Sequence, residues 1–215
     1  VEKIMKKNSL WLALVIALAS LLLWLAFFWQ PAADDTSLHK SSAATNVQGG
    51  DFRLDSPDGP VALSDFKGKV VALYFGYTFC PDVCPTALIA VSQAFSQLSP
   101  AELAKTKGLF VSVDPQRDTL DVLKVYVPYF HPAITGLRGS EADIARIAAL
   151  YGVRYMKQKA DRDGQYPVDH SSFTYLIGPD GNLAASLPHG TPAQDIAARI
   201  RARGGPATPA ARCRK

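Results

Sequence analysis

Hydrophobic and polar positions divide the middle of the chain into alternating strand and helix patterns. Residues 70–75 form a continuous apolar run that is flanked closely by glycines. Such a run is typical of a central strand that is buried on both faces. Residues 109–113 predict a second strand, and between the two strands apolar residues recur at three- and four-residue steps. This spacing predicts a helix over about 84–98, and so a strand–helix–strand unit.

The rest of the folded segment predicts further elements of both kinds. Ser140 is suited to cap a helix that begins just after it, and the Asp-Gly pair at residues 180–181 is typical of a hairpin turn. The predicted elements are helices over 118–130, 141–151 and 192–203 and strands over 153–158, 173–177 and 183–187. Their order predicts an α/β sandwich with a mixed sheet. A domain of about 150 residues buries a sufficient core without disulfide bonds.

A long apolar segment near the N-terminus has a different pattern. Residues 10–29 contain no charged residue, and a helix of this length spans the roughly 30 Å hydrocarbon core of a membrane. Lysines precede the segment and aspartates follow it. The positive-inside rule therefore places residues 1–9 in the cytoplasm and the rest of the chain on the exported side. We expect a single-pass inner-membrane protein whose functional domain is periplasmic or otherwise extracytoplasmic.

The rival interpretation of this segment is a cleaved signal peptide. The apolar region of a signal peptide is usually about 7–15 residues long and is followed by a small-x-small cleavage site. The apolar run here is longer, and residues 30–33 (Gln-Pro-Ala-Ala) are a poor site. We therefore expect an uncleaved anchor over 10–29, a flexible linker over 30–47, a folded domain over 48–203 and a disordered tail over 204–215.

Charge is distributed unevenly along the chain. The formal net charge is +4, which on its own invites a nucleic-acid-binding interpretation. Residues 48–203 contain 16 basic and 16 acidic residues, so the basic excess belongs to the two ends of the chain. The composition gives no support for a basic nucleic-acid-binding face, and we expect no nucleic-acid partner.

Two of the three cysteines lie close together where the first predicted strand gives way to a helix. Cys80 and Cys84 belong to the sequence Cys-Pro-Asp-Val-Cys, in which Pro81 fits the first helical turn. If the helix starts there, the four-residue spacing places both sulfurs on one helix face, and the helix N-terminus lowers the pKa of the thiols. A purely structural disulfide is the alternative, although bridges that stabilise a core usually close longer loops.

A histidine completes a candidate metal site. His170 precedes the predicted strand over 173–177, and in an α/β sheet the start of such a strand can approach the turn that carries the cysteines. Two thiolates and an imidazole suit copper, with zinc as the competitor. Structural zinc usually takes four protein ligands, and no fourth cysteine or histidine is well placed, which favours copper. Asp169 and Asp82 are candidates to orient the imidazole or to add negative charge near it.

The remaining histidines and the third cysteine are weaker candidates. His39 lies in the predicted linker, and His131 and His189 lie in predicted loops. We expect all three to face solvent. Cys213 lies in the predicted tail, and we expect an incidental free thiol there.

Three separated segments carry a family resemblance. They are residues 63–85 (LSDFKGKVVALYFGYTFCPDVCP), 114–119 (DPQRDT) and 166–181 (YPVDHSSFTYLIGPDG). In this order they resemble the Sco/SenC family of membrane-anchored, thioredoxin-like proteins, which are tied to the copper site of cytochrome c oxidase subunit II. The resemblance covers about residues 48–203.

The resemblance has implications for the fold and the site. It implies a thioredoxin-like fold with additional strands and helices. It also implies that Cys80, Cys84 and His170 are ligands of Cu(I) or Cu(II), and that the two cysteines can cycle between a dithiol and a disulfide. The expected partners are the copper domain of subunit II, other periplasmic copper or thiol-redox proteins, and the membrane through the N-terminal helix.

More than one function remains open. In the first, the protein is a copper metallochaperone that assembles the binuclear copper site of subunit II. In the second, it is a thiol–disulfide oxidoreductase that reduces the cysteines of that site, which requires Cys80 and Cys84 but not His170. A copper or redox sensor is a further alternative. A thiol peroxidase is disfavoured, because such enzymes typically carry a threonine three residues before the reactive cysteine, where this chain has Tyr77.

Overall fold

The structure of the 215-residue chain is a computed structural model, which describes residues 16–24 and 47–204. These residues belong to two compact units. Residues 16–24 are helical and are the described part of the predicted anchor over 10–29. No helix within the described ranges is both long enough and apolar enough to cross a membrane. The predicted N-terminal segment 1–9, most of the predicted linker and the tail beyond Gly204 lie outside the described residues.

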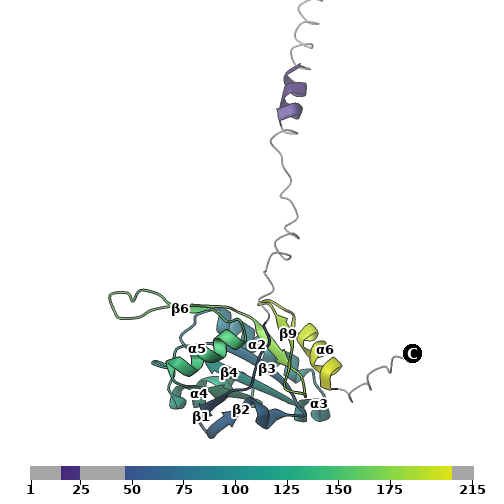
Figure 1. The fold of residues 1–215 in the computed structure, drawn as a ribbon. Coiled ribbons are helices and arrows are strands. Elements are labelled where there is room, and N and C mark those ends of the chain that lie inside the picture. Colours follow the sequence, from purple (N-terminus) through teal and green to yellow (C-terminus); the bar gives the residue numbers. More distant parts are fainter. Residues whose placement is uncertain (1–15, 25–46, 205–215) are drawn as a thin grey trace, which may run out of the picture. The chain divides into compact units, whose positions relative to one another are not determined.

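The described part of the second unit is a mixed α/β fold (Figure 1). Its strands are β1 (Arg53–Ser56), β2 (Gly59–Ala62), β3 (Val70–Gly76), β4 (Thr106–Ser112), β5 (Ile134–Leu137), β6 (Tyr155–Lys157), β7 (Val168–His170), β8 (Thr174–Ile177) and β9 (Leu183–Leu187). Its helices are the 3₁₀ helix η2 (Leu63–Phe66) and the α-helices α2 (Val83–Ser96), α3 (Pro100–Ala104), α4 (Leu120–Phe130), α5 (Glu141–Leu150) and α6 (Ala193–Gly204). Ser140 caps α5 as predicted, since its hydroxyl accepts a hydrogen bond from the Asp143 N–H at 3.1 Å. The predicted α/β class with a mixed sheet is confirmed.

Five strands form the central sheet in the order β5-β4-β3-β8-β9. β3 pairs in parallel with β4, and β4 with β5, whereas β8 runs antiparallel to β3 and β9. All seven residues of β3 are buried, as expected for a strand at the centre of a covered sheet. Because β8 is antiparallel to β3, its first residue, Thr174, pairs with Tyr74 near the end of β3. The segment before β8 therefore returns to the edge of the sheet where β3 leads into α2.

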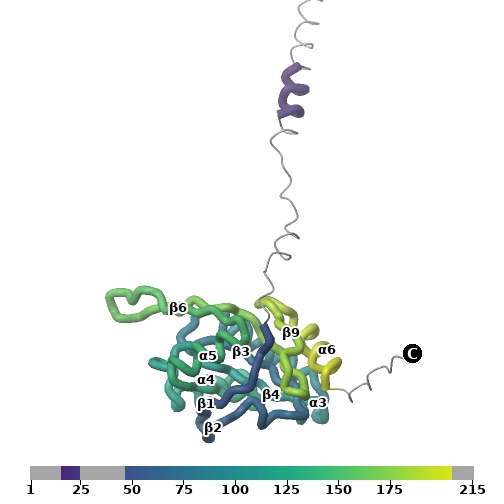
Figure 2. The backbone as a smooth tube through the Cα atoms, in the orientation of Figure 1, coloured from purple at the N-terminus to yellow at the C-terminus, as the bar shows by residue number. Residues whose placement is uncertain are grey.

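Helices and two small sheets surround the central sheet. α2 lies beside α6 and contacts α4, and the Ser92 hydroxyl in α2 donates a hydrogen bond to the Phe130 carbonyl at the end of α4 (2.6 Å). Figure 1 and Figure 2 show α5 in front of the sheet. β1 and β2 form a hairpin, and β6 and β7 form a separate two-stranded antiparallel sheet. We call residues 155–170, which are β6, β7 and the loop between them, the β6–β7 arm.

Several short elements are not predicted by the hydrophobic pattern: β1, β2, β5, β7 and α3. Strands of three or four residues are too short for an alternating pattern to be recognised. α3 does have a local signal, because Ser99 and Glu102 have the spacing of a capping box. The Ser99 N–H donates to the Glu102 carboxylate (2.7 Å), and the Glu102 N–H donates to the Ser99 hydroxyl (3.3 Å).

Candidate metal centre

Cys80 and Cys84 lie where β3 gives way to α2, as predicted, and the helix begins at Val83, one residue before the expected start at about 84. Asp82 is the N-cap residue of α2. Its carbonyl accepts the first hydrogen bonds of the helix, from the N–H (3.1 Å) and the hydroxyl (2.9 Å) of Thr86. Pro81 therefore precedes the helix and does not lie in its first turn, so the condition for placing both sulfurs on one helix face is not met, and Cys80 lies in the preceding loop. The two sulfurs meet because this loop folds back onto the helix, not because of helical periodicity.

The structure brings the three candidate ligands together. The sulfur atoms of Cys80 and Cys84 and a ring nitrogen of His170 all lie within 4.8 Å of one another. His170 Nε2 is 3.2 Å from Cys84 Sγ, and the Cys84 N–H donates to Cys80 Sγ at 3.5 Å. Among the described residues, this is the only group of three or more Cys, His, Asp or Glu side chains with metal-ligand spacing. Both cysteines are free thiols in this structure.

The close approach of Cys84 to the sheet requires a glycine at the end of β3. A Cβ atom on Gly76 would lie 2.8 Å from Cys84 Sγ. It would also lie 2.9 Å from the ring of Tyr74 and 3.0 Å from the ring of Phe110. All three neighbours are buried and have little room to move. Gly76 therefore provides the space that the thiol occupies.

Hydrogen bonding and packing fix the orientation of the His170 ring. Nδ1 lies 3.1 Å from the carbonyl oxygen of Ser171, and because a carbonyl can only accept, Nδ1 carries the proton. Nε2, which faces Cys84, therefore presents a lone pair, as a metal-binding nitrogen must. The rings of Tyr74 and Tyr77 are nearly perpendicular to the imidazole, with centroids 6.1 Å and 5.9 Å from it.

Neither of the two candidate carboxylates orients this ring. The Asp169 carboxylate accepts a hydrogen bond from Gln158 Nε2 (2.5 Å), because adjacent residues of a strand point to opposite faces. Asp169 acts on His170 only as a nearby negative charge that raises the pKa of the imidazole, and this effect is outweighed by burial. The Asp82 side chain makes no capping hydrogen bond, and within residues 47–204 no hydrogen bond joins it to His170. The orienting group is the Ser171 carbonyl.

Burial controls the protonation of the site. It raises the pKa of the Cys84 thiol far above its ordinary value and lowers the pKa of His170. The expectation that the helix N-terminus favours a thiolate is therefore wrong for Cys84, because the side chain is fully buried and desolvation dominates. Before a metal binds, Cys84 is therefore a thiol and His170 a neutral imidazole. A soft metal cation fits these donors, since it displaces the thiol proton and supplies the positive charge that a buried thiolate lacks.

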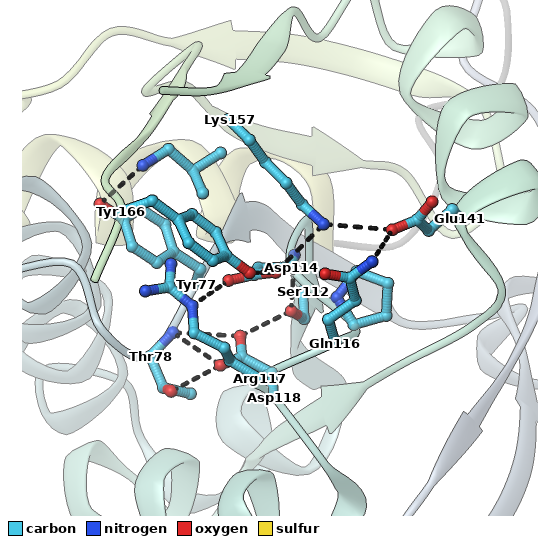
Figure 3. Close-up of polar contacts among 12 residues, drawn as sticks. Tyr77, Thr78, Ser112, Asp114, Gln116, Arg117, Asp118, Glu141, Lys157 and Tyr166 are labelled. Carbon is cyan, nitrogen blue, oxygen red and sulfur yellow. Dashed lines mark hydrogen bonds and ion pairs between the residues drawn. The ribbon is translucent and has the colours of Figure 1, made fainter. Parts of the chain in front are cut away.

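The loop that carries Cys80 is anchored by a buried carboxylate. Asp118 is fully buried and accepts hydrogen bonds from the N–H (3.1 Å) and hydroxyl (2.6 Å) of Thr78 and from the hydroxyl of Ser112 (2.6 Å), as Figure 3 shows. The prediction that Asp118 begins a helix is wrong, because α4 begins after its N-cap residue Thr119. Asp118 instead joins the loops that follow β3 and β4, and no periodic pattern in the sequence marks this role.

Tyr77 joins the two halves of the site. Its side chain is buried, its ring packs edge-on against His170, and its hydroxyl accepts a hydrogen bond from the Val168 N–H in β7 (3.2 Å). Tyr77 occupies the position where thiol peroxidases typically carry a threonine. In this protein it links the loop that carries Cys80 to the strand that carries His170.

The weaker candidates lie apart from the site. His189 is exposed, as predicted. His131 is not: it is half-buried, its Nδ1 accepts a hydrogen bond from the backbone N–H two residues later (3.0 Å), and its ring packs edge-on against Phe95 at 5.3 Å. His39 and Cys213 lie outside the described residues.

Known proteins share a large part of this sequence. The chain is 40% identical over 154 residues to "Protein SCO2 homolog, mitochondrial" of Bos taurus, a match that covers 71% of this chain and 58% of the bovine protein. It is 37% identical over 154 residues to an SCO2-like protein of Rickettsia felis, which covers 71% of this chain and 73% of that protein. The chain spans about half the length of the mitochondrial relatives that it matches.

Solved structures share the fold, and the sequence profile of a family covers most of the chain. ScoI of Bradyrhizobium japonicum with copper bound has a TM-score of 0.66 and 35% identity, covering 72% of this chain and 98% of that one. BsSco, described as having a disulfide switch and as a member of the Sco family of cytochrome c oxidase assembly proteins, has a TM-score of 0.57 and 26% identity, covering 73% and 93%. The fold is thus thioredoxin-like, as in other Sco structures. The profile of the SCO1/SenC family matches residues 40–203, and the chain therefore belongs to the SCO1/SenC family.

Proposed function

We propose that this protein is a copper metallochaperone that binds one copper ion through Cys80, Cys84 and His170. It supplies this cargo to the binuclear copper site of cytochrome c oxidase subunit II. The observation that carries the proposal is the convergence of two sulfurs and one imidazole nitrogen within 4.8 Å. Copper-bound structures of relatives support the choice of metal, and the assembly role named for BsSco supports the choice of partner.

The donor set suits copper in both oxidation states. Two thiolates satisfy Cu(I), which prefers soft ligands, and the imidazole nitrogen adds a ligand that Cu(II) favours. The hydrogen bond from Nδ1 of His170 to the Ser171 carbonyl leaves Nε2 free for the metal. Zinc is the less suitable cargo, because structural zinc usually takes four protein ligands.

Ligand exchange with a partner starts at Cys80. Cys80 is 8% exposed, whereas Cys84 is fully buried, so an incoming thiol reaches the Cys80 side of the site first. His170 is more exposed than either cysteine, so it also lies on the outer side of the site, and Cys84 is the ligand that retains the metal longest. The order of exposure therefore gives the transfer a direction, from the two outer ligands inward to Cys84.

A second candidate function is thiol–disulfide exchange, which the two adjacent free thiols favour. The Cys80 thiolate would attack a disulfide of the partner and form a mixed disulfide, and Cys84 would then attack Cys80 Sγ and release the partner dithiol. The electron pair comes from the Cys80–Cys84 dithiol, so an external dithiol reductant must restore it. The raised pKa of Cys84 opposes its attack, which makes copper transfer the better-supported function.

The two functions are separated by comparing His170→Ala with Cys80→Ser in the full-length chain, kept in detergent. Addition of Cu(II) to the reduced wild-type protein should give a thiolate-to-copper charge-transfer band and one copper per chain. We expect the band to vanish in Cys84→Ser, and His170→Ala to bind copper weakly and to block assembly of the partner site. The exposed His189 provides the control, since His189→Ala should behave as wild type.

Two outcomes would overturn the copper proposal. If His170→Ala supports full assembly of the partner copper site while Cys80→Ser does not, the protein is a reductase. If X-ray absorption of the copper-loaded wild-type protein finds no sulfur ligand, the site is not the one proposed.

We further propose that residues 10–29 anchor the protein in the inner membrane, with residues 1–9 in the cytoplasm. Residues 30–47 form a linker to the exported domain, which other exported copper or thiol-redox proteins also contact. The charge-free apolar run and the lysines that precede it support this topology. Protease added to intact spheroplasts should digest the domain over 48–203, and protection of that domain would contradict the topology.

A further inference from the structure

We infer that Arg117 is a positioning residue for the metal site. It holds the β6–β7 arm against the cysteine-bearing loop and so keeps His170 within reach of the two thiols. The inference rests on the proposed copper site, but it concerns a residue that makes no hydrogen bond or ion pair with the three ligands within the described part of the chain.

The arm that carries His170 is not part of the central sheet. Within the part of the chain that the structure describes, β6 and β7 pair only with each other, with Tyr155 opposite His170. Figure 1 and Figure 2 show the loop between them projecting away from the body of the domain. A two-stranded ribbon is marginally stable on its own. The position of His170 therefore depends on contacts between the arm and the loops that follow β3 and β4.

Three contacts from the arm converge on two residues of those loops. The Val168 N–H donates to the Tyr77 hydroxyl (3.2 Å), and the Tyr166 hydroxyl donates to Asp114 Oδ1 (2.9 Å). The ammonium nitrogen of Lys157 lies 3.6 Å from the same carboxylate oxygen. Figure 3 shows these side chains meeting beside the loops after β3 and β4.

Arg117 lies between these anchoring residues. Its Nε forms an ion pair with Asp114. Its guanidinium carbon lies 3.7 Å from the ring centre of Tyr166, 4.9 Å from that of Phe79 and 5.6 Å from that of Tyr77. One planar cation thus contacts the arm through Tyr166 and the cysteine-bearing loop through Tyr77 (Figure 3). It also contacts that loop through Phe79.

Charge and shape both select an arginine at this position. Asp114 is fully buried, so its charge requires the positive charges of Arg117 and Lys157. The Nη2 atom of Arg117 is buried and has no hydrogen-bond partner among the described residues, so the ion pair and the stacking on aromatic rings hold the guanidinium in place. A planar guanidinium stacks in this way, whereas a lysine ammonium is a point charge. Lysine therefore replaces the charge but not the contact with Tyr166.

A loosened arm has different consequences for the two oxidation states of copper. The two cysteines do not lie on the arm, and they are sufficient ligands for Cu(I). Cu(II) depends more strongly on the imidazole nitrogen. Loss of Arg117 should therefore weaken Cu(II) binding more than Cu(I) binding and raise the reduction potential of the bound copper. A general loss of folding would weaken both equally.

The test is Arg117→Met in the full-length chain, alone and combined with His170→Ala. We expect the dissociation constant for Cu(II) to rise about tenfold or more, as for other residues that orient metal ligands, and that for Cu(I) to change by less than about threefold. The nitrogen hyperfine coupling in the electron paramagnetic resonance spectrum of the Cu(II) protein should weaken. In the His170→Ala background Arg117→Met should have no further effect on Cu(II) binding, and Arg117→Lys should restore wild-type binding only in part.

The matched control is Arg146→Met, because Arg146 is an exposed arginine whose ion pair within residues 47–204 is with Asp143 alone. This variant should bind both ions as wild type does. Equal weakening of both ions in Arg117→Met, effects additive with His170→Ala, or unchanged Cu(II) binding would each overturn the inference. If the wild-type protein shows no nitrogen coupling at all, the proposed copper site fails instead.

Tyr166→Phe provides the second test if Arg117→Met does not fold. This change removes only the hydroxyl that bonds to Asp114 and leaves the ring that Arg117 stacks on. We again expect the affinity for Cu(II) to decrease more than the affinity for Cu(I). Both decreases should be smaller than in Arg117→Met. Unchanged binding of both ions in a folded Tyr166→Phe protein would contradict the role of the arm contacts.

Discussion

The two sides of the metal centre are built in different ways. Cys84 projects from the first turn of α2 into the core beside the end of β3, where Gly76 makes room for its sulfur. His170 comes from a small separate sheet that polar side chains hold in place. The thiol side is fixed by hydrophobic packing. The imidazole side combines the buried Val168 and the packing of tyrosine rings with hydrogen bonds and ion pairs.

This difference implies unequal mobility of the ligands. Core strands open only when the whole domain unfolds, whereas elements with few buried contacts open locally. The thiols therefore remain in place while the imidazole can be withdrawn. One of the three ligands of a site that must release its metal thus lies on the β6–β7 arm, the element whose displacement requires the least free energy.

The largest effect on stability is expected from a substitution on the thiol side of the metal centre. Gly76→Ala places a methyl group 2.8 Å from Cys84 Sγ and 2.9 Å from the Tyr74 ring. We expect a loss of about 3 kcal/mol in the free energy of unfolding, because a packed core does not accept the extra atom. Copper binding should also weaken for both oxidation states. Chemical denaturation measures the first effect. Gly59→Ala is the comparison variant, because a Cβ atom on Gly59 would meet no atom within 4 Å. Its loss of stability reports only the backbone strain of a side chain at a φ of +117°.

A smaller effect is expected from the anchor of the cysteine-bearing loop. Asp118→Ala leaves the Thr78 N–H and the Ser112 hydroxyl without their acceptor. Buried donors without partners should lower the free energy of unfolding by about 2 kcal/mol. Asp121→Ala, at an exposed position in the first turn of α4, is the comparison variant. Equal denaturation midpoints for the two variants would show that Asp118 is not an anchor.

Acidification should open the imidazole side and spare the thiol side. Burial lowers the pKa of His170 below its ordinary value of 6.5, so the unfolded chain takes up a proton at a higher pH than the folded chain does. The stability that the neutral imidazole provides is complete above pH 6.5 and is lost as the pH falls below it. As the pH falls below 6.5, we expect hydrogen exchange of the Val168 amide to accelerate relative to that of Leu73 in β3.

A local measurement is needed because burial also lowers the pKa of His131, which adds to any global dependence on pH. The faster exchange of the Val168 amide at low pH should disappear in His170→Ala. Acceleration at Leu73 as large as at Val168 would show that the two sides open together.

The smallest effect is expected from the single hydrogen bond between the two sides. Tyr77→Phe removes the acceptor of the Val168 N–H but keeps the ring that packs against His170. One neutral hydrogen bond contributes about 1 kcal/mol. The free energy needed to open the β6–β7 arm should therefore decrease by this amount. Hydrogen exchange in β7 checks this, and faster exchange in β3 in the same variant would contradict the separation of the two sides.

The parts of the fold that could be predicted from the sequence are those with long apolar patterns. The buried strand β3 and the amphipathic helix α2 are predicted because burial on two faces or on one stripe determines their residues. The thiol pair follows from its place between them. The exact start of α2 could not be predicted, because Pro81 and Pro85 both suit a first turn.

The imidazole side could be predicted only in part. The predicted strand over 153–158 contains β6, but β7 has only three residues, which is too short for a periodic signal. Arg117 and Tyr166 meet across 49 positions of sequence through a stacking contact, and no local pattern marks such a pair. The segments over 114–119 and 166–181 identify these two residues as part of a family pattern, but their role comes from the folded geometry.

The spacing of the ligands has a consequence for how the chain folds. Cys80 and Cys84 are neighbours in any conformation, whereas Cys84 and His170 are 86 positions apart. The thiol pair is therefore present in the nascent and unfolded chain, and the third ligand joins only after the slow, long-range pairing of β8 with β3. A chain that meets Cu(I) early can bind it to an unfolded segment, and such binding would stabilise the wrong state. Three-ligand coordination therefore reports that the two distant parts of the chain that form the site have come together.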